Sequence, residues 1–217
     1  TAYWMGRSAQ GFFMYDGYVQ PIPCDVESFL VSEINQAQAS KVIAWHNTLF
    51  NEVCWFYPGD SSEVDAYISY NYLEKHWSVG TMARSAVMSR GIFLHPILFD
   101  PSGNPYEHEV GNTYADVGAA AIVPYVESGP IQLGDGDRVL SATSLIPDVT
   151  ALGDITTTFY TRLYPTDSDT THGPYTMVAP TSVRFTGRTC RMKATSDSSA
   201  AWNLGIPRLE MRPGGRR

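Results

Sequence analysis

Short apolar and aromatic segments, each followed by turn-forming residues, fill the middle of the first half of the chain. The connections between them contain the Asn, Pro, Gly, Asp or Ser residues that tight turns require. Segments of this length that are rich in Val, Ile, Tyr and Trp favour β-strands over helices. We therefore predict four successive antiparallel strands, at residues 41–46, 52–57, 64–70 and 76–81.

These four strands occupy about 41 residues, which is the size of one four-stranded blade of a β-propeller. On their N-terminal side, an Asp-Gly pair between apolar runs predicts a hairpin at residues 11–24. On their C-terminal side, a second hairpin is predicted at residues 96–111. Apolar residues at helical spacing predict one short helix at residues 25–40, with Asp25 as its N-cap.

The second half of the chain contains further strand-like segments and no helical periodicity. Long connections rich in Gly, Pro and Asp separate these segments, as in compact antiparallel domains. A stretch of small, neutral residues at 111–121 indicates a connection between two domains. Strands are expected near residues 121–127, 137–146, 154–164, 174–179, 181–193 and 201–212.

Composition agrees with a turn-rich β protein. Only 17% of residues are charged, whereas Gly (18), Pro (14) and Tyr (13) are plentiful. The predicted fold class is all-β, with a partial β-propeller of four-stranded blades followed by a β-sandwich or jelly-roll-like domain and one short helix. The predicted domains are residues 1–115 and 116–217. The chain opens on strand-like sequence at Thr1, which indicates a fragment or a processed product.

No pattern for catalysis, metal binding or a cofactor stands out. The three cysteines, Cys24, Cys54 and Cys190, are odd in number and widely spaced, so they predict neither a disulfide framework nor a metal site. The five histidines are scattered, and phosphate-loop and serine-elbow motifs are absent. We predict a non-enzymatic chain with no cofactor. No apolar run approaches the roughly 18 residues of a membrane span, so no membrane segment is predicted.

Charge is distributed unevenly. The chain carries a net charge of −7, yet residues 184–217 hold eight basic and two acidic residues. The basic end therefore carries +6 and the rest −13, an asymmetry that fits contact with phosphate, with an acidic protein or with a neighbouring copy of the same chain. Salt bridges within the fold are the alternative explanation. The candidate subunit-interface or DNA-facing residues of this end are Arg184, Arg188, Arg191, Lys193, Arg208 and Arg212.

Two further polar clusters carry alternative interpretations. The segment "YNYLEKHWSVGT" at residues 70–81 is predicted to be a hairpin whose tip, with Glu74 and Lys75, faces solvent or a neighbouring subunit. The segment "YEHEVG" would place Glu107 and Glu109 on one face of a strand and His108 on the other. A carbohydrate-active or carbohydrate-binding protein is the alternative, in which Glu74 or Glu107 would meet Asp65 or Asp100 in a cleft beside aromatic rings.

Several motifs in one order resemble a known family. "NEVCWFYPGDSSEVDAYISYNYLEKHWSVGTMARSA" resembles the signature of packaged-DNA stabilisation proteins, the tail hub or nozzle proteins of short-tailed bacteriophages. Later matches are "YEHEVG", "YVESGPIQLGDGDR", "LIPD", "GPYTM", "TGRTCRMK" and "WNLGIPRLEMRPGGRR". The resemblance covers nearly the whole chain and corresponds to the C-terminal part of such proteins.

The resemblance implies a structural virion protein that forms a ring, expected to hold six copies, around the channel through which DNA leaves. The implied partners are other copies of itself, portal and adaptor proteins, tail fibres or a tail needle, and the packaged double-stranded DNA. The implied location is the phage tail, assembled in the cytoplasm of the host bacterium. A carbohydrate-binding or carbohydrate-active protein and a direct DNA-binding protein remain the alternatives.

Overall fold

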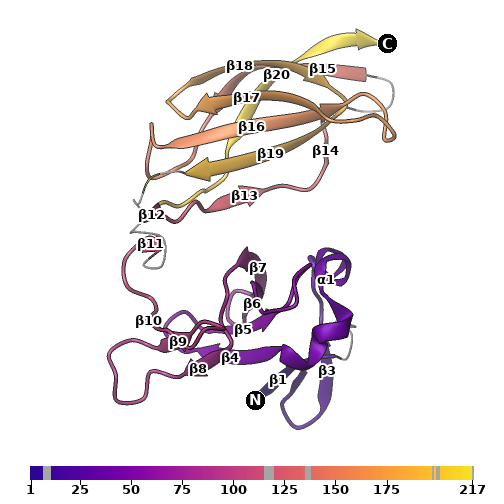
Figure 1. Ribbon diagram of the computed structural model, residues 1–217. Coiled ribbons are helices and arrows are strands. Elements are labelled where there is room, and N and C mark those ends of the chain that lie inside the picture. Colours follow the sequence, from indigo (N-terminus) through magenta and orange to yellow (C-terminus); the bar gives the residue numbers. More distant parts are fainter. Residues whose placement is uncertain (7–10, 115–119, 135–137, 197, 199–200, 217) are drawn as a thin grey trace. The chain divides into compact units, whose positions relative to one another are not determined.

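A computed structural model describes residues 1–6, 11–114, 120–134, 138–196, 198 and 201–216. The chain is mostly β-structure in several antiparallel sheets and divides into two compact units, Thr1–Val110 and Gly111–Arg217 (Figure 1). The predicted domain boundary at residue 115 lies outside the described residues. Across the described ranges, no helix has the length and apolar character needed to cross a membrane.

The first unit contains three antiparallel sheets that follow one another along the chain. The first consists of β1 (Ala2–Met5), β2 (Phe12–Tyr15) and β3 (Val19–Ile22). The second consists of β4 (Ile43–Asn47), β5 (Glu52–Tyr57), β6 (Ala66–Asn71) and β7 (His76–Thr81). The third consists of β8 (Ala86–Met88), β9 (Ile97–Phe99) and β10 (Pro105–Glu107). The four strands predicted in succession therefore pair in one sheet.

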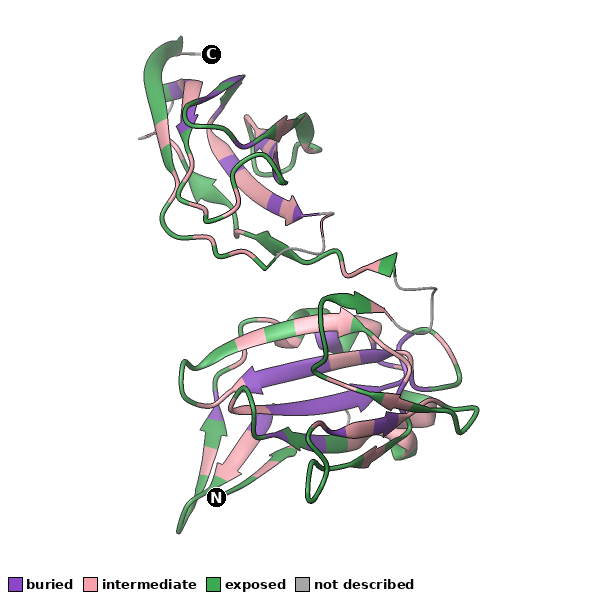
Figure 2. Cartoon of the chain, turned by 90° about the vertical axis from the view of Figure 1, so that its left-hand side faces the viewer, coloured by how far each residue is buried: buried purple, intermediate pink, exposed green. Residues whose placement is uncertain are grey.

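Both faces of this four-stranded sheet are buried, and β5 and β6 are buried along most of their length (Figure 2). Val53, Trp55 and Tyr57 on one face join a core that includes Phe12 of β2 and Leu30 of the helix. Trp45, Cys54 and Phe56 on the other face join a core with Leu98 of β9. The central sheet is thus covered by one flanking sheet on each side.

The prediction of one helix over residues 25–40 is wrong. The segment forms α1 (Glu27–Glu33) and a separate 3-10 helix, η2 (Gln36–Lys41). The backbone is extended at Ile34, which buries its side chain in the core. The side chain of Asn35 then caps η2 by accepting a hydrogen bond from the Ala37 N–H, at 3.1 Å. Val26, not Asp25, is the N-cap residue of α1.

The second unit contains one short two-stranded sheet and two larger sheets. The short sheet pairs β11 (Thr113–Tyr114) with β12 (Ala120–Ala121). One larger sheet contains β13 (Tyr125–Glu127), β14 (Ile131–Gln132), β16 (Ile155–Arg162), β17 (Thr170–Thr176) and β19 (Thr189–Ser196). The other contains β15 (Arg138–Ile146), β18 (Thr181–Gly187) and β20 (Arg208–Arg216).

The two larger sheets contribute to one hydrophobic core. Phe159 of β16 and Ala194 of β19 meet Leu145 of β15 and Phe185 of β18 in this core. The rings of Phe159 and Phe185 have centroids 4.6 Å apart. Side chains alternate between buried and less buried along β16 and β18, as expected for strands with one face on a core.

The single strand predicted at residues 181–193 is two strands. Gly187 ends β18, and β19 begins at Thr189, so the chain reverses between them. A Cβ on Gly187 would lie 2.9 Å from Cβ of Thr161, and glycine is therefore required for this close approach. The reversal sends the two strands into different sheets, which changes where the basic residues lie.

Replacing Phe159 by alanine should destabilise the second unit by about 3–5 kcal/mol, because Phe159 is fully buried and its loss leaves a cavity. Urea denaturation followed by circular dichroism would measure the change. Thr158→Val is the matched control, since Thr158 lies on the opposite face of β16 and its replacement should change stability by less than about 0.5 kcal/mol. Equal effects of both substitutions would contradict the described core.

Candidate functional site

The basic residues predicted as one interface lie on two different sheets of the second unit. On β18, Arg184 is exposed and alternates with the buried Val183 and Phe185. On β20, Leu209 packs on the core, so Arg208 lies on the outward face, and Arg212 pairs in register with the outward-facing Ser141 of β15. Arg184, Arg208 and Arg212 therefore share the outer face of the β18-β15-β20 sheet.

Arg191 and Lys193 belong to the other larger sheet. On β19, Cys190 and Ala194 are buried in the core, so Arg191 and Lys193 project from the opposite, outer face. Arg188 lies in the turn between the two sheets, where its carbonyl accepts a hydrogen bond from the Leu133 N–H at 2.7 Å. The six candidates thus divide among two outer faces and a turn, and they form no continuous basic stripe.

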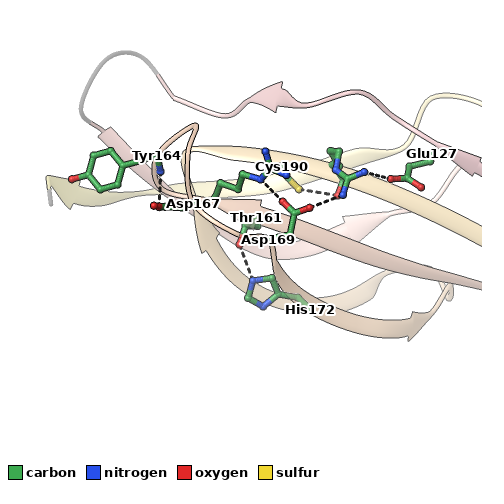
Figure 3. Close-up of polar contacts among 9 residues, drawn as sticks. Glu127, Thr161, Tyr164, Asp167, Asp169, His172 and Cys190 are labelled. Atoms are coloured by element: carbon green, nitrogen blue, oxygen red, sulfur yellow. Dashed lines mark hydrogen bonds and ion pairs between the residues drawn. The ribbon is translucent and has the colours of Figure 1, made fainter. Parts of the chain in front are cut away.

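Arg191 is the centre of a charged network on this outer face, and Figure 3 labels its carboxylate partners Glu127 and Asp169. It donates hydrogen bonds to Glu127 of β13 and, at 2.6 Å, to the Asp169 carboxylate. The Asp169 carboxylate also accepts a hydrogen bond from Arg162 of β16, at 2.5 Å. We call Glu127, Arg162, Asp169 and Arg191 the charged network. It joins three strands of the sheet, β13, β16 and β19, to the segment before β17.

Aromatic rings accompany the cations of this sheet. The Arg191 guanidinium lies 4.9 Å from the ring centroid of Tyr160, and the Lys193 ammonium lies 4.2 Å from that of Tyr125. At the turn, the Arg188 guanidinium lies 4.8 Å from the Tyr164 ring centroid. Each contact lies within cation–π range. Arg191 is therefore bound by carboxylates and a ring of its own unit, as the salt-bridge alternative predicted.

The hairpin tip predicted at Glu74 and Lys75 is present between β6 and β7. The Asn71 carboxamide oxygen accepts hydrogen bonds from the N–H groups of Leu73 and Glu74, at 3.0 and 2.9 Å. Lys75 has a φ of 59°, in the left-handed region, and its N–H donates to the Asn71 carbonyl. Both Glu74 and Lys75 are exposed and belong to the first unit, whereas the basic candidates belong to the second.

The strand predicted through "YEHEVG" ends sooner than expected. Because β10 stops at Glu107 and the backbone at Glu109 is left-handed, with a φ of 64°, these two carboxylates do not follow the alternation of one strand. Glu109 instead accepts a hydrogen bond from the Asn47 side chain at 2.8 Å. The buried Arg84 donates to Nε2 of His108 at 2.8 Å, a contact that its sequence position did not indicate.

Glu109 meets a carboxylate that the sequence had not singled out. It lines a pocket of about 190 Å³ in the first unit together with Glu52, the first residue of β5. We call this the carboxylate pocket. Its other lining residues are Trp45, Asn47, Cys54, Phe56, Tyr67, Ser69, Ser78, Met82 and His108. Asp65 and Asp100, proposed as carboxylate partners from sequence, are absent from that lining and accept hydrogen bonds from Gly59 and Asn104.

The electrostatics of the carboxylate pocket oppose ionisation. Burial raises the pKa of Glu52, and the neighbouring charge of Glu109 raises it further, although His76 acts in the opposite sense. Burial also raises the pKa of Glu109, against the lowering effects of the Asn47 hydrogen bond and of His95. Glu109 is exposed as a residue, whereas its carboxylate accepts a hydrogen bond from the buried Asn47.

Within the described ranges, no group of three or more His, Cys, Asp and Glu side chains is positioned to hold a metal ion. The three cysteines are free thiols. Burial raises the pKa of Cys24 and of Cys190 to about 11, and it also raises that of Cys54. Such thiols stay protonated at neutral pH and are weak nucleophiles.

Comparison with protein-family models and with curated proteins found no match. The resemblance to phage tail proteins therefore rests on the sequence motifs alone. The geometry offers three features on which a function can be built: the apolar sheets of the first unit, the charged outer faces of the second and the carboxylate pocket.

Replacing Asp169 by asparagine should lower the melting temperature at neutral pH. The Arg162 hydrogen bond, with a further contribution from Arg191, lowers the pKa of Asp169, so the ionised form is favoured in the folded state. The resulting stability is present above the ordinary pKa of Asp and is lost as the pH falls through the lowered value. Melting curves between about pH 2 and 7 should therefore converge at the acid end.

The matched control for Asp169 is Glu210→Gln, which removes one exposed ion pair, to Arg212 at 3.9 Å. That change should leave the melting temperature nearly constant, since exposed single pairs contribute little. A profile for Asp169→Asn that parallels the wild type at every pH would show that the charged network does not stabilise the fold.

Replacing Glu52 by glutamine should raise the melting temperature at neutral pH by a few degrees. Since the folded-state pKa of Glu52 lies above its ordinary value, ionisation opposes folding. The penalty is absent below the ordinary pKa and grows as the pH rises through the raised value. Differential scanning calorimetry should show a gain at pH 7 and little difference near pH 3. Glu107→Gln, at the exposed end of β10, should show neither effect.

Proposed function

We propose that this chain is a structural protein of the tail of a short-tailed bacteriophage, part of a nozzle or hub ring around the DNA exit channel. Its role would be to help retain packaged DNA and to let it leave during ejection. The proposal rests on the ordered sequence motifs and on one structural observation, the stack of three antiparallel sheets in the first unit.

Sheets of three, four and three strands follow one another in chain order, and the middle sheet packs on both neighbours. Successive blades of a β-propeller have this relationship, because each blade packs face to face on the next. The arrangement supports a partial propeller in the first unit. In the second unit, two sheets around one core support a β-sandwich.

Both end faces of the stack are apolar and lack a covering sheet among the described residues. On the outer face of the β1–β3 sheet, Trp4 stacks on Phe13 and both lie in register with Pro21. Tyr15 and Val19 complete this face and are 50% and 59% exposed. The outer face of the β8–β10 sheet carries Ala86, Met88, Ile97, Phe99, Pro105 and Glu107.

An exposed apolar sheet face of this kind is typical of a surface that is covered in an assembly. In a ring of identical copies, each subunit needs lateral contacts of different composition on its two sides. Apolar end faces on an acidic first unit and charged outer faces on the second provide such different surfaces. Other tail proteins and the passing DNA would then be the partners of the assembled ring.

A carbohydrate-binding or carbohydrate-active protein is the second candidate, favoured by the two carboxylates and the tryptophan of the carboxylate pocket. Trp45 is only 6% exposed, however, so it offers no open platform for a sugar ring. The two carboxylates of the pocket are also not the ones that the sequence predicted, since Glu74 and Glu107 are not among the pocket residues. We therefore favour the structural role.

Replacing Tyr15 by lysine should disrupt assembly, because it places a charge on the apolar outer face of the β1–β3 sheet, at the last residue of β2. The wild-type chain is expected to form rings, detected by light scattering after gel filtration and by negative-stain electron microscopy. Tyr18→Lys is the matched control, since Tyr18 is also exposed but lies in the β2–β3 turn, outside the sheet face. A wild-type chain that stays monomeric at every concentration would contradict the proposal.

A further inference from the structure

The carboxylate pocket contains two acidic side chains, Glu52 and Glu109, neither of which forms a salt bridge with a described residue. The Glu52 carboxylate makes no hydrogen bond to the described residues, and the Glu109 carboxylate accepts one, from the neutral Asn47 amide. The two carboxylates are close enough for the charge of Glu109 to act on Glu52. Placing two like charges in a partly buried pocket is costly unless a cation accompanies them.

A second, independent observation concerns a serine in the same pocket. Ser69 is only 4% exposed and lines the pocket, and its side-chain hydroxyl makes no hydrogen bond to any residue that the structure describes. Buried hydroxyl groups are normally hydrogen-bonded. Ser78, its cross-strand partner on β7, also lines the pocket and is exposed, so the pocket is open toward that edge strand.

The two carboxylates of the pocket therefore need further hydrogen-bond donors. Carboxylates accept only, and the Asn47 side chain already uses its Nδ2 donor on Glu109 and its oxygen on the Leu49 N–H. A guanidinium group presents five donors, carries a fixed positive charge and accepts nothing. Its planar form also packs well against aromatic rings, which Trp45 and Tyr67 provide.

The same geometry disfavours a bare metal ion. The titratable side chains in the described ranges form no group able to coordinate one. A pocket of about 190 Å³ is far larger than a single ion and has room for a small organic group. The pairing of two carboxylates with serine hydroxyls matches the planar fork of a guanidinium better than it matches a point charge.

We propose that the carboxylate pocket, formed by Glu52, Glu109 and Ser69, is a binding site for a guanidinium group. A free alkylguanidine and an arginine side chain of another chain would present the same chemistry. In either case the guanidinium lies between Glu52 and Glu109, and Ser69 accepts a further hydrogen bond. This site is additional to the structural role proposed above and does not depend on it.

Isothermal titration calorimetry of the full chain at low salt tests the site. The probes are methylguanidine, for a free cation, and N-acetyl-arginine methylamide, for an arginine within a chain. N-acetyl-citrulline methylamide is the neutral control of the same shape. Both charged probes should bind and the citrulline compound should not. Tighter binding of the arginine probe would identify an arginine side chain as the natural occupant, and equal binding would identify the free cation.

Glu52→Gln and Glu109→Gln should each weaken binding of the charged probes roughly tenfold or more, because each removes one charged hydrogen-bond acceptor. Glu107→Gln, which changes an exposed carboxylate two residues from Glu109, should leave the affinity unchanged. A folded Glu52→Gln variant that binds as tightly as the wild type would overturn the proposal. Equal binding of the citrulline and arginine probes, or no binding of either charged probe, would also overturn it.

Discussion

Burial of both faces of the β4–β7 sheet is the constraint on which the first unit depends. β5 carries bulky apolar side chains in alternation, with Trp55 directed to one core and Phe56 to the other. Such a strand is stable only between two covering layers. The β1–β3 sheet with α1 and the β8–β10 sheet provide those layers. Each covering sheet is also apolar on the face that points away from the β4–β7 sheet. The first unit therefore has apolar faces at its surface, and these faces also need to be covered.

The carboxylate pocket is a consequence of the same packing. Small side chains on one face of the central sheet, Cys54 and Ser69, leave space where larger ones would fill the gap. The chain after β10 then turns at Glu109, whose left-handed backbone directs its carboxylate toward Asn47 on the edge strand β4. Because the covering layer leaves part of the sheet uncovered, polar side chains face one another in a partly buried pocket.

In the second unit, one turn decides the distribution of charge. A continuous strand at residues 181–193 would have kept its arginines within one sheet. The reversal at Gly187 instead sends Arg184 to one sheet and Arg191 to another, where Glu127 and Asp169 bind it. The charge asymmetry along the sequence therefore does not become a single basic surface on this unit.

Local sequence by itself determined the strands with clear alternation and strong turns. β5, β7, the Asp-Gly hairpin of β2 and β3 and the tip at Glu74 follow the predicted pattern because turn chemistry and side-chain period act between near neighbours. Only the tertiary structure decided the break of the predicted helix at Ile34, the reversal at Gly187 and the meeting of Glu52 with Glu109. These features depend on core burial and on contacts such as Asn47 to Glu109, across 62 residues, which no local pattern encodes.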